Sequence, residues 1–78
     1  NATLENAKML DANLDGANLT NADLRNILLV DANLSNATLK GADLTNGILT
    51  GAILTDANLE NAILTNAIMN CIDHPVCV

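Results

Sequence analysis

The chain contains no Phe, Tyr or Trp among its 78 residues. Any core must therefore consist of aliphatic side chains and Met, packed without large rings. Basic residues are also scarce: three Lys and Arg stand against nine Asp and Glu, which gives a formal net charge of −6. Binding to nucleic acid depends on a basic surface that meets phosphates, so this composition argues against nucleic acid as a partner.

Two further absences limit the possible functions. The longest apolar run, Ile27 to Val30, is far shorter than the roughly 20 residues that cross a bilayer, so we expect no membrane insertion. One Ser, one His and scattered carboxylates show no catalytic spacing. The sequence therefore predicts a protein that is not an enzyme, with no catalytic residues and no cofactor.

What the chain has instead is a five-residue period that runs from Ala2 to Cys71 without insertion or deletion. Fourteen consecutive units fit the pattern Ala-x-Leu-x-x, and only Ile27 and Gly47 replace the Ala. The central residue is Met at positions 9 and 69, and Leu at positions 4, 14, 19, 24, 29, 34, 39, 44, 49, 54, 59 and 64. Such a repeat determines the architecture ahead of local secondary-structure preference.

Neither a helix nor a flat strand explains this period. On an α-helix, at about 100° per residue, Leu residues five apart scatter around all sides. On a strand they alternate between the two faces. The period fits a chain that turns a quarter of a circle every five residues and points each Leu and its preceding Ala toward one axis. Coils of about twenty residues then stack at roughly 4.8 Å and hydrogen-bond to each other.

Three stretches, Ala17–Asn21, Ala22–Asn26 and Ala42–Asn46, closely resemble the Ala-(Asp/Asn)-Leu-x-x signature of pentapeptide repeat proteins. The resemblance covers residues 2–71. It implies an all-β fold, the right-handed quadrilateral β-helix of that family, which is abundant in cyanobacteria and also occurs in plastids. We expect a solenoid of about three and a half coils over residues 1–71, at about twenty residues per coil, and a cap or tail over residues 72–78. The family has no common activity, so the fold does not decide the function.

One side of the predicted coil is unusually apolar on its outside. A period of twenty residues places the centres at 4, 24, 44 and 64 on a first side, those at 9, 29, 49 and 69 on a second, those at 14, 34 and 54 on a third, and those at 19, 39 and 59 on a fourth. The outward positions that flank the second set carry five large aliphatic side chains, here called the aliphatic face: Leu10, Leu28, Val30, Ile48 and Ile68. Ile27 and Gly47 belong to the same side, and Ile53 and Ile63 widen it near the C-terminal end. We interpret this face as a surface for a protein partner or for self-association. The alternative is that these side chains only form favourable ladders along the stacked coils.

Two columns of carboxylates are also predicted. Asp23 stacks on Asp43, and Asp11 stacks on Asp31. A bound cation such as Ca²⁺ is one way to relieve their repulsion. The simpler interpretation is that Asp accepts hydrogen bonds from turn backbone, with Arg25 compensating Asp23, so we expect no metal site. A structural role at the corners is predicted for the Asn residues that follow the centres by two positions, at 6, 21, 26, 36, 46, 61 and 66.

The pattern stops after Cys71, and the tail contains the only His and the only Pro of the chain, His74 and Pro75. We expect a disulfide between Cys71 and Cys77, because a short loop with Pro can bring their Cα atoms within about 7 Å. The spacing Cys-x-x-His-x-x-Cys also permits zinc, with Asp73 as a fourth ligand, and two reduced thiols are the third possibility. A disulfide implies an oxidising compartment such as a thylakoid lumen or periplasm, whereas reduced thiols fit the cytoplasm.

The leading functional hypothesis is a structural or protein-interaction module. Because Asn1 is already in register with the repeat, we expect either that a targeting peptide has been removed or that the chain is part of a longer array. The alternative function is that of family members that imitate DNA and inhibit a topoisomerase such as DNA gyrase. Acidity favours that alternative, whereas the short length, the absence of Phe at the centres and the scattered carboxylates oppose it.

Overall fold

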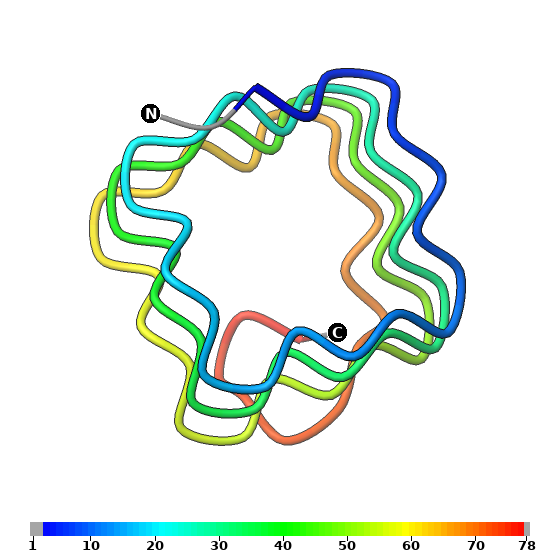
Figure 1. Ribbon diagram of the computed structural model, residues 1–78, viewed down its shortest axis with the longest axis vertical. Helices are drawn as coiled ribbons and strands as arrows, with labels where there is room; N and C mark the ends of the chain where they lie inside the picture. Colours follow the sequence, from blue (N-terminus) through cyan, green and yellow to red (C-terminus); the bar gives the residue numbers. More distant parts are fainter. Residues whose placement is uncertain (1–2, 78) are drawn as a thin grey trace.

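The computed structural model describes residues 3–77, which form a coil with four sides (Figure 1). Ala2, where the repeat begins, lies outside the described residues. In Figure 1 the chain runs clockwise as it recedes from the viewer, so the coil is right-handed. The shortest extent of the molecule, along this view, is 18 Å. The quadrilateral β-helix implied by the family resemblance is therefore the fold that the chain adopts.

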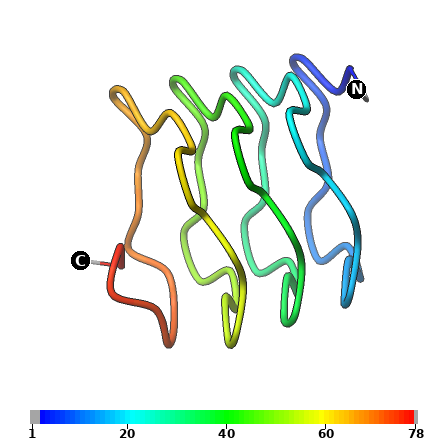
Figure 2. The same ribbon diagram turned by 90° about the vertical axis from the view of Figure 1, so that its left-hand side faces the viewer.

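Successive coils are joined by single-residue parallel bridges, and residues 3–77 contain no helix and no longer strand. The bridged residues are twenty apart, as in Asp23 to Asp43. The backbone N–H of Leu24 donates to the carbonyl of Asp43 (2.8 Å), and the N–H of Asp43 donates to the carbonyl of Ala22 (3.0 Å). The coils lie side by side in Figure 2 because this pairing repeats on every side. The twenty-residue spacing predicted from the repeat is thus confirmed.

Each corner is a turn that requires a left-handed backbone. Every fifth residue from 6 to 66 has a positive φ between 58° and 72°, and all of these residues are Asn, Asp or Gly. These are the residue types that adopt this conformation at the lowest cost. A hydrogen bond across the corner closes each turn, as from the N–H of Ala42 to the carbonyl of Leu39 (3.0 Å). The structural role predicted for the Asn residues is confirmed.

Two glycines at corners serve a second purpose. A Cβ atom added to Gly41 would collide with the side-chain oxygen of Asn21, and one added to Gly51 would collide with Asp31. Each of these polar side chains leans over the corner of the next coil. Glycine therefore provides both the left-handed φ and the space that the stacked neighbour occupies.

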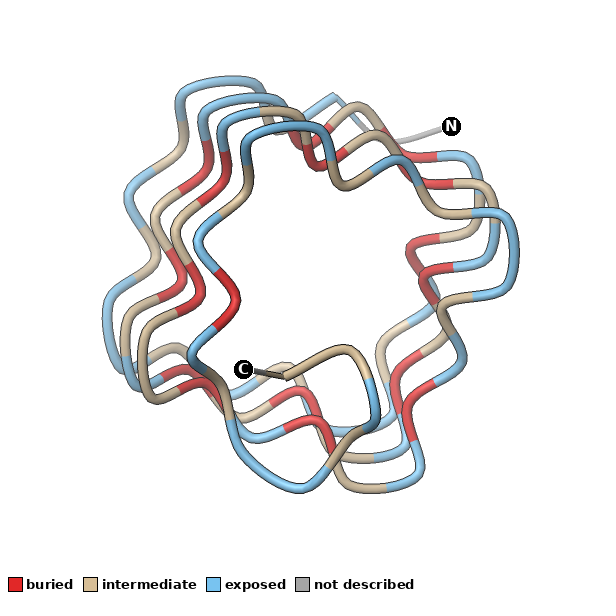
Figure 3. Cartoon of the chain, turned by 180° about the vertical axis from the view of Figure 1, so that it is seen from behind, coloured by how far each residue is buried: buried red, intermediate tan, exposed pale blue. Residues whose placement is uncertain are grey.

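The core is a column of Leu lined by Ala. Eight side chains are fully buried: Leu24, Ile27, Leu29, Leu34, Leu39, Leu44, Leu49 and Leu54. At the two ends the same inward positions, such as Leu4 and Leu64, are only half-buried. Figure 3 shows the alternation of buried and exposed residues along each side. Burial is greatest in the middle coils because each of them is covered on both sides by another coil.

The two departures from inward Ala lie next to each other. Ile27 is buried, and its Cγ2 atom lies 3.5 Å from the place where a Cβ of Gly47 would be, which is an ordinary packing distance. The atom nearest to that place is the backbone oxygen of Leu44, at 3.0 Å. Ile27 and Gly47 are twenty apart and stack in neighbouring coils, where the N–H of Ile48 donates to the carbonyl of Ile27 (2.9 Å). The larger and the smaller departure are therefore neighbours in the interior.

The register changes by one residue at the C-terminal end. Ile72 pairs with Ile53, which is 19 residues earlier rather than 20. The N–H of Leu54 donates to the carbonyl of Ile72 (3.0 Å), and the N–H of Ile72 donates to the carbonyl of Ala52 (2.8 Å). The following residues fold back over the end of the coil (Figure 3). Among the described residues, no helix is long and apolar enough to span a membrane.

Candidate interaction surface and C-terminal cover

The outward residues of the second side form one continuous ladder. Lys8, Leu28, Ile48 and Ile68 are linked by consecutive parallel bridges along the right-hand side of Figure 1. Leu28 and Ile48 are half-buried by their stacked neighbours, whereas Ile68, at the end of the ladder, is 48% exposed. The remaining two members of the aliphatic face lie one residue beyond the centres: Leu10 is 56% exposed and Val30 is half-buried.

Each of the other three sides has two outward Asn or Asp residues that bond the adjacent backbone, and the aliphatic face has none. An outward Asn or Asp accepts a hydrogen bond from the backbone N–H two residues later, as Asn33 does from Ser35 (3.0 Å). The same contact is made by Asn13, Asn18, Asp23, Asp43 and Asn58. A Leu or Ile offers no acceptor, and within residues 3–77 the N–H groups of Leu10, Val30 and Thr50 donate no hydrogen bond. The aliphatic face therefore combines apolar side chains with unused donors.

Exposed isoleucines gather toward the C-terminal end. Ile53, Ile63, Ile68 and Ile72 are all exposed; the first three occupy the outward position before a centre, and Ile72 pairs with Ile53. The sequence indicated Ile53 and Ile63 as an extension of the aliphatic face, but it assigned Ile72 to the tail. Ile72 takes the outward position 19 residues after Ile53, one residue earlier than the period of twenty predicts. A strictly regular repeat gives no sign of this shift.

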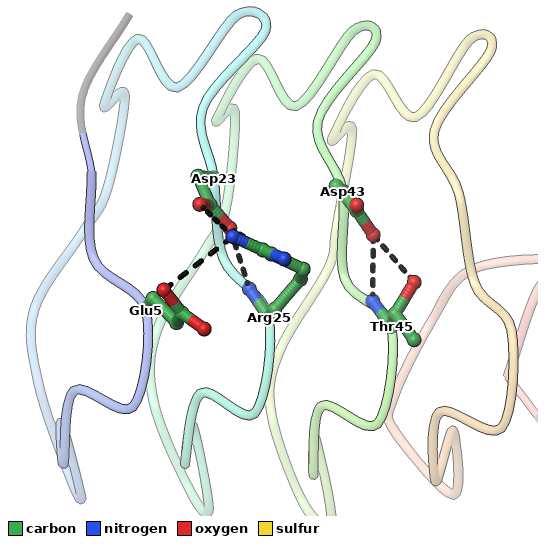
Figure 4. A network of polar contacts seen from close by, with 5 residues as sticks. All are labelled: Glu5, Asp23, Arg25, Asp43 and Thr45. Carbon is green, nitrogen blue, oxygen red and sulfur yellow. Dashed lines mark hydrogen bonds and ion pairs between the residues drawn. The ribbon is translucent and has the colours of Figure 1, made fainter.

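The carboxylate column on the first side is neutralised locally (Figure 4). Arg25 donates two hydrogen bonds to Asp23, from Nε (2.8 Å) and Nη2 (2.7 Å), and its Nη2 lies 3.4 Å from Glu5. Asp43 accepts from the Thr45 hydroxyl (2.5 Å) and N–H (3.0 Å). The side-chain hydrogen bond from Arg25 lowers the pKa of Asp23, and the same bond raises the pKa of Arg25. The predicted compensation of Asp23 by Arg25 is confirmed.

The second carboxylate column, Asp11 and Asp31, lies at the corner that follows the aliphatic face. Across residues 3–77 no three His, Cys, Asp or Glu side chains gather in a way that suits a metal ion. No pocket was found in this part of the chain either.

A disulfide between Cys71 and Cys77, with Cα atoms 4.9 Å apart, closes the C-terminal loop as predicted. Both sulfur atoms are used in this bond, so neither is a thiolate that can bind zinc. Val76 and Cys77 pack against the core and cover part of its end.

His74 has a role that the sequence did not reveal. Its Nδ1 accepts a hydrogen bond from the N–H of Val76 (3.3 Å), so the ring proton is on Nε2, which lies 3.0 Å from the carbonyl of Ala57. In the preceding coil, the equivalent carbonyl of Ala37 accepts from the backbone N–H of Asn58 (2.9 Å). The imidazole therefore replaces the donor that a further coil would provide.

The family model described as "Pentapeptide repeats (8 copies)" matches residues 1–36 and 32–70. Rfr23, a pentapeptide repeat protein from the cyanobacterium Cyanothece 51142, is 43% identical, with a TM-score of 0.86, over 92% of this chain and 50% of that chain. A pentapeptide repeat protein from the thylakoid lumen of Arabidopsis thaliana is 31% identical, with a TM-score of 0.67; the match covers 88% of this chain and 56% of that chain. A pentapeptide repeat protein from Nostoc is 36% identical, with a TM-score of 0.60; the match covers 86% of this chain and 60% of that chain.

This chain thus spans between half and three fifths of the length of these solved relatives. No curated protein matches it.

Proposed function

Because this chain belongs to the pentapeptide repeat family, we propose that it is a non-enzymatic protein-interaction module whose contact surface is the aliphatic face. The observation that carries this proposal is the ladder Leu28, Ile48 and Ile68, in which three apolar outward residues follow one another, whereas each other side includes outward Asn or Asp. A rigid apolar strip on the outside of a small protein is a feature that commonly marks a contact surface. Its occupant is a protein partner or a second copy of the chain.

The backbone of this face supports the same proposal. The unused N–H groups of Leu10, Val30 and Thr50 lie beside the apolar side chains. A partner that binds here can accept hydrogen bonds from these N–H groups and also make apolar contact. On the polar sides a partner would first have to displace the Asn and Asp side chains that already occupy the equivalent donors. The aliphatic face is the side where binding requires the least rearrangement.

The test is affinity capture from a cyanobacterial extract with three baits: the parent chain, Ile48→Asp and Thr38→Asp. Thr38 is the matched control, because it occupies the same outward position on the fourth side and is bridged on both sides, as Ile48 is. We expect a protein that is retained by the parent and by Thr38→Asp but lost with Ile48→Asp. Far-UV circular dichroism verifies that all three baits are folded. Equal capture by all three baits contradicts the proposal, and so does capture by none if the parent is also a monomer in solution.

Self-association is tested on the same three proteins by sedimentation velocity. If a second copy is the occupant, the parent and Thr38→Asp sediment as oligomers and Ile48→Asp as a monomer. If all three are monomers, the occupant is a different protein.

We also propose that the protein works in an oxidising compartment, the thylakoid lumen or a periplasm. The disulfide between Cys71 and Cys77 supports this location, as does the similarity to an Arabidopsis protein of the thylakoid lumen. We further infer that residues 1–71 form a solenoid of about three and a half coils, at roughly twenty residues per coil, and that residues 72–78 are its cap.

A further inference from the structure

We propose that the Cys71–Cys77 disulfide is a reducible site for a dithiol, and that its cleavage uncovers the C-terminal end of the coil. This inference is independent of the aliphatic face. It starts from the position of the loop that the disulfide closes. The loop begins where the repeat ends, and it places Val76 and Cys77 against the core. The N-terminal end of the described chain has no comparable loop across it (Figure 1).

Few other bonds hold this loop to the body of the protein. After Ile72, two hydrogen bonds connect them within residues 3–77: from the Thr55 hydroxyl to Asp73 (2.8 Å) and from the His74 ring to the carbonyl of Ala57 (3.0 Å). The first of these is exposed to solvent. Single hydrogen bonds of this kind contribute little net stability. The disulfide is therefore the main tether, because it joins Cys77 to the last residue of the repeat.

The disulfide is also within reach of a reductant. Cys71 and Cys77 are half-buried rather than buried, and the loop residues between them include the exposed Ile72, Asp73 and Pro75. A thiolate of the dithiol attacks one sulfur atom, the other leaves as a thiolate and takes up a proton, and a mixed disulfide forms. The second thiol of the reductant then resolves it. Two electrons pass to the protein, which ends with two thiols, and the reductant ends as a disulfide.

Loss of this tether has defined structural consequences. The carbonyl of Ala57 loses its donor when His74 moves away, and the buried Met69 loses the cover at the end of the coil. The pairing of Ile72 with Ile53 becomes the last backbone bond to the coil before the released loop. The newly accessible apolar end adds to exposed isoleucines that already gather there. Reduction thus changes the end of the coil and leaves the middle coils intact.

The test compares amide hydrogen exchange at two equivalent positions, before and after treatment of the folded protein with dithiothreitol. The Leu54 N–H donates to Ile72, next to the loop, whereas the Leu34 N–H donates to Ile53, one coil away. We expect exchange at Leu54 to accelerate by about tenfold or more, because local opening raises exchange only where it occurs. Exchange at Leu34 should stay unchanged.

Two variants complete the test. The double variant Cys71→Ser/Cys77→Ser should show the fast Leu54 exchange of the reduced parent and should not respond to dithiothreitol. In the oxidised protein His74→Ala should leave Leu54 slow, since the disulfide still holds the loop. The proposal is overturned if the folded protein resists reduction, if Leu54 does not accelerate, if Leu34 accelerates equally, or if His74→Ala alone gives the full acceleration.

Discussion

On the second side of the coil Leu28 and Ile48 stack outward, whereas on the fourth side Thr38 and Asn58 occupy the same position. The backbone of the two sides is alike: the same single bridges, the same corner turns and the same inward Leu column. The difference lies in the N–H two residues later. Asn58 accepts a hydrogen bond from the N–H of Glu60 (2.9 Å), whereas Thr38, Leu28 and Ile48 all leave the equivalent N–H unused.

This comparison separates stability from recognition in a repeat protein. Inward residues are similar on all four sides, apart from Met9, Met69, Ile27 and Gly47 on the second, and they hold the coils together through burial. Outward residues are nearly free to vary, because the fold does not depend on them. An outward Asn or Asp closes its position by accepting a hydrogen bond from the adjacent backbone. An apolar residue leaves its position open to another molecule.

The largest expected effect is a loss of stability when a buried Leu behind either side is shortened, and it tests whether the two sides pack equally well inside. Leu29→Ala, behind the aliphatic face, and Leu39→Ala, behind the fourth side, each remove a fully buried side chain. Both should lower the free energy of unfolding by about 3 kcal/mol, through lost burial and the cavity that remains. Urea denaturation followed by circular dichroism is the measurement, because the chain has no aromatic residue for fluorescence. A difference above about 1.5 kcal/mol between the variants would show that the two sides differ inside as well.

A somewhat smaller effect is expected where the interiors do differ. Ile27→Ala should cost about 2 kcal/mol, because it leaves a cavity against Gly47. Adding Gly47→Ala should recover roughly 1 kcal/mol of this loss, since the new methyl group fills part of the space. In the parent, Gly47→Ala should change stability by less than about 1 kcal/mol. The double-mutant cycle measures the coupling, and strict additivity would contradict the packing of Ile27 against Gly47.

Exchanging the outward residues should have effects of about 1 kcal/mol or less. Asn33→Leu removes the acceptor for the Ser35 N–H, and Leu28→Asn creates one for the Val30 N–H. Amide exchange should therefore become faster at Ser35 in the first variant and slower at Val30 in the second. Hydrogen exchange monitored by NMR measures both rates. If neither rate changes, the outward Asn does not control whether a side is open or closed.

The smallest effect concerns the ion pair of the first side. Arg25→Gln should raise the pKa of Asp23 toward its ordinary value, because the hydrogen bond from Arg25 is the main cause that lowers it. Because the pKa of Asp23 is lowered in the folded state, its ionised carboxylate stabilises that state at pH values above the unfolded-state pKa of about 3.9. This contribution is lost as the pH falls through the folded-state pKa. Parent and variant should therefore differ slightly near neutral pH and converge in acid. NMR titration of the Asp23 carboxyl gives the pKa directly, and an unchanged value would contradict the role of Arg25.

Much of the architecture was predictable because the repeat is so regular. The corner residues, the inward Leu column, the compensation of Asp23 by Arg25 and the disulfide between Cys71 and Cys77 all follow from residue type and spacing. The role of Ile27 and Gly47 was less accessible. Their shared side is visible in the sequence, but how closely they pack depends on which atoms meet between neighbouring coils.

By itself the sequence determined that the chain coils, because only a quarter turn every five residues brings all the Leu side chains to one axis. It also determined which side is apolar, since a period of twenty sorts the outward residues into columns. Only the tertiary structure decided the C-terminal end. There the period has stopped, and Ile72 meets Ile53 while His74 meets Ala57 because of where the end of the last coil lies in space.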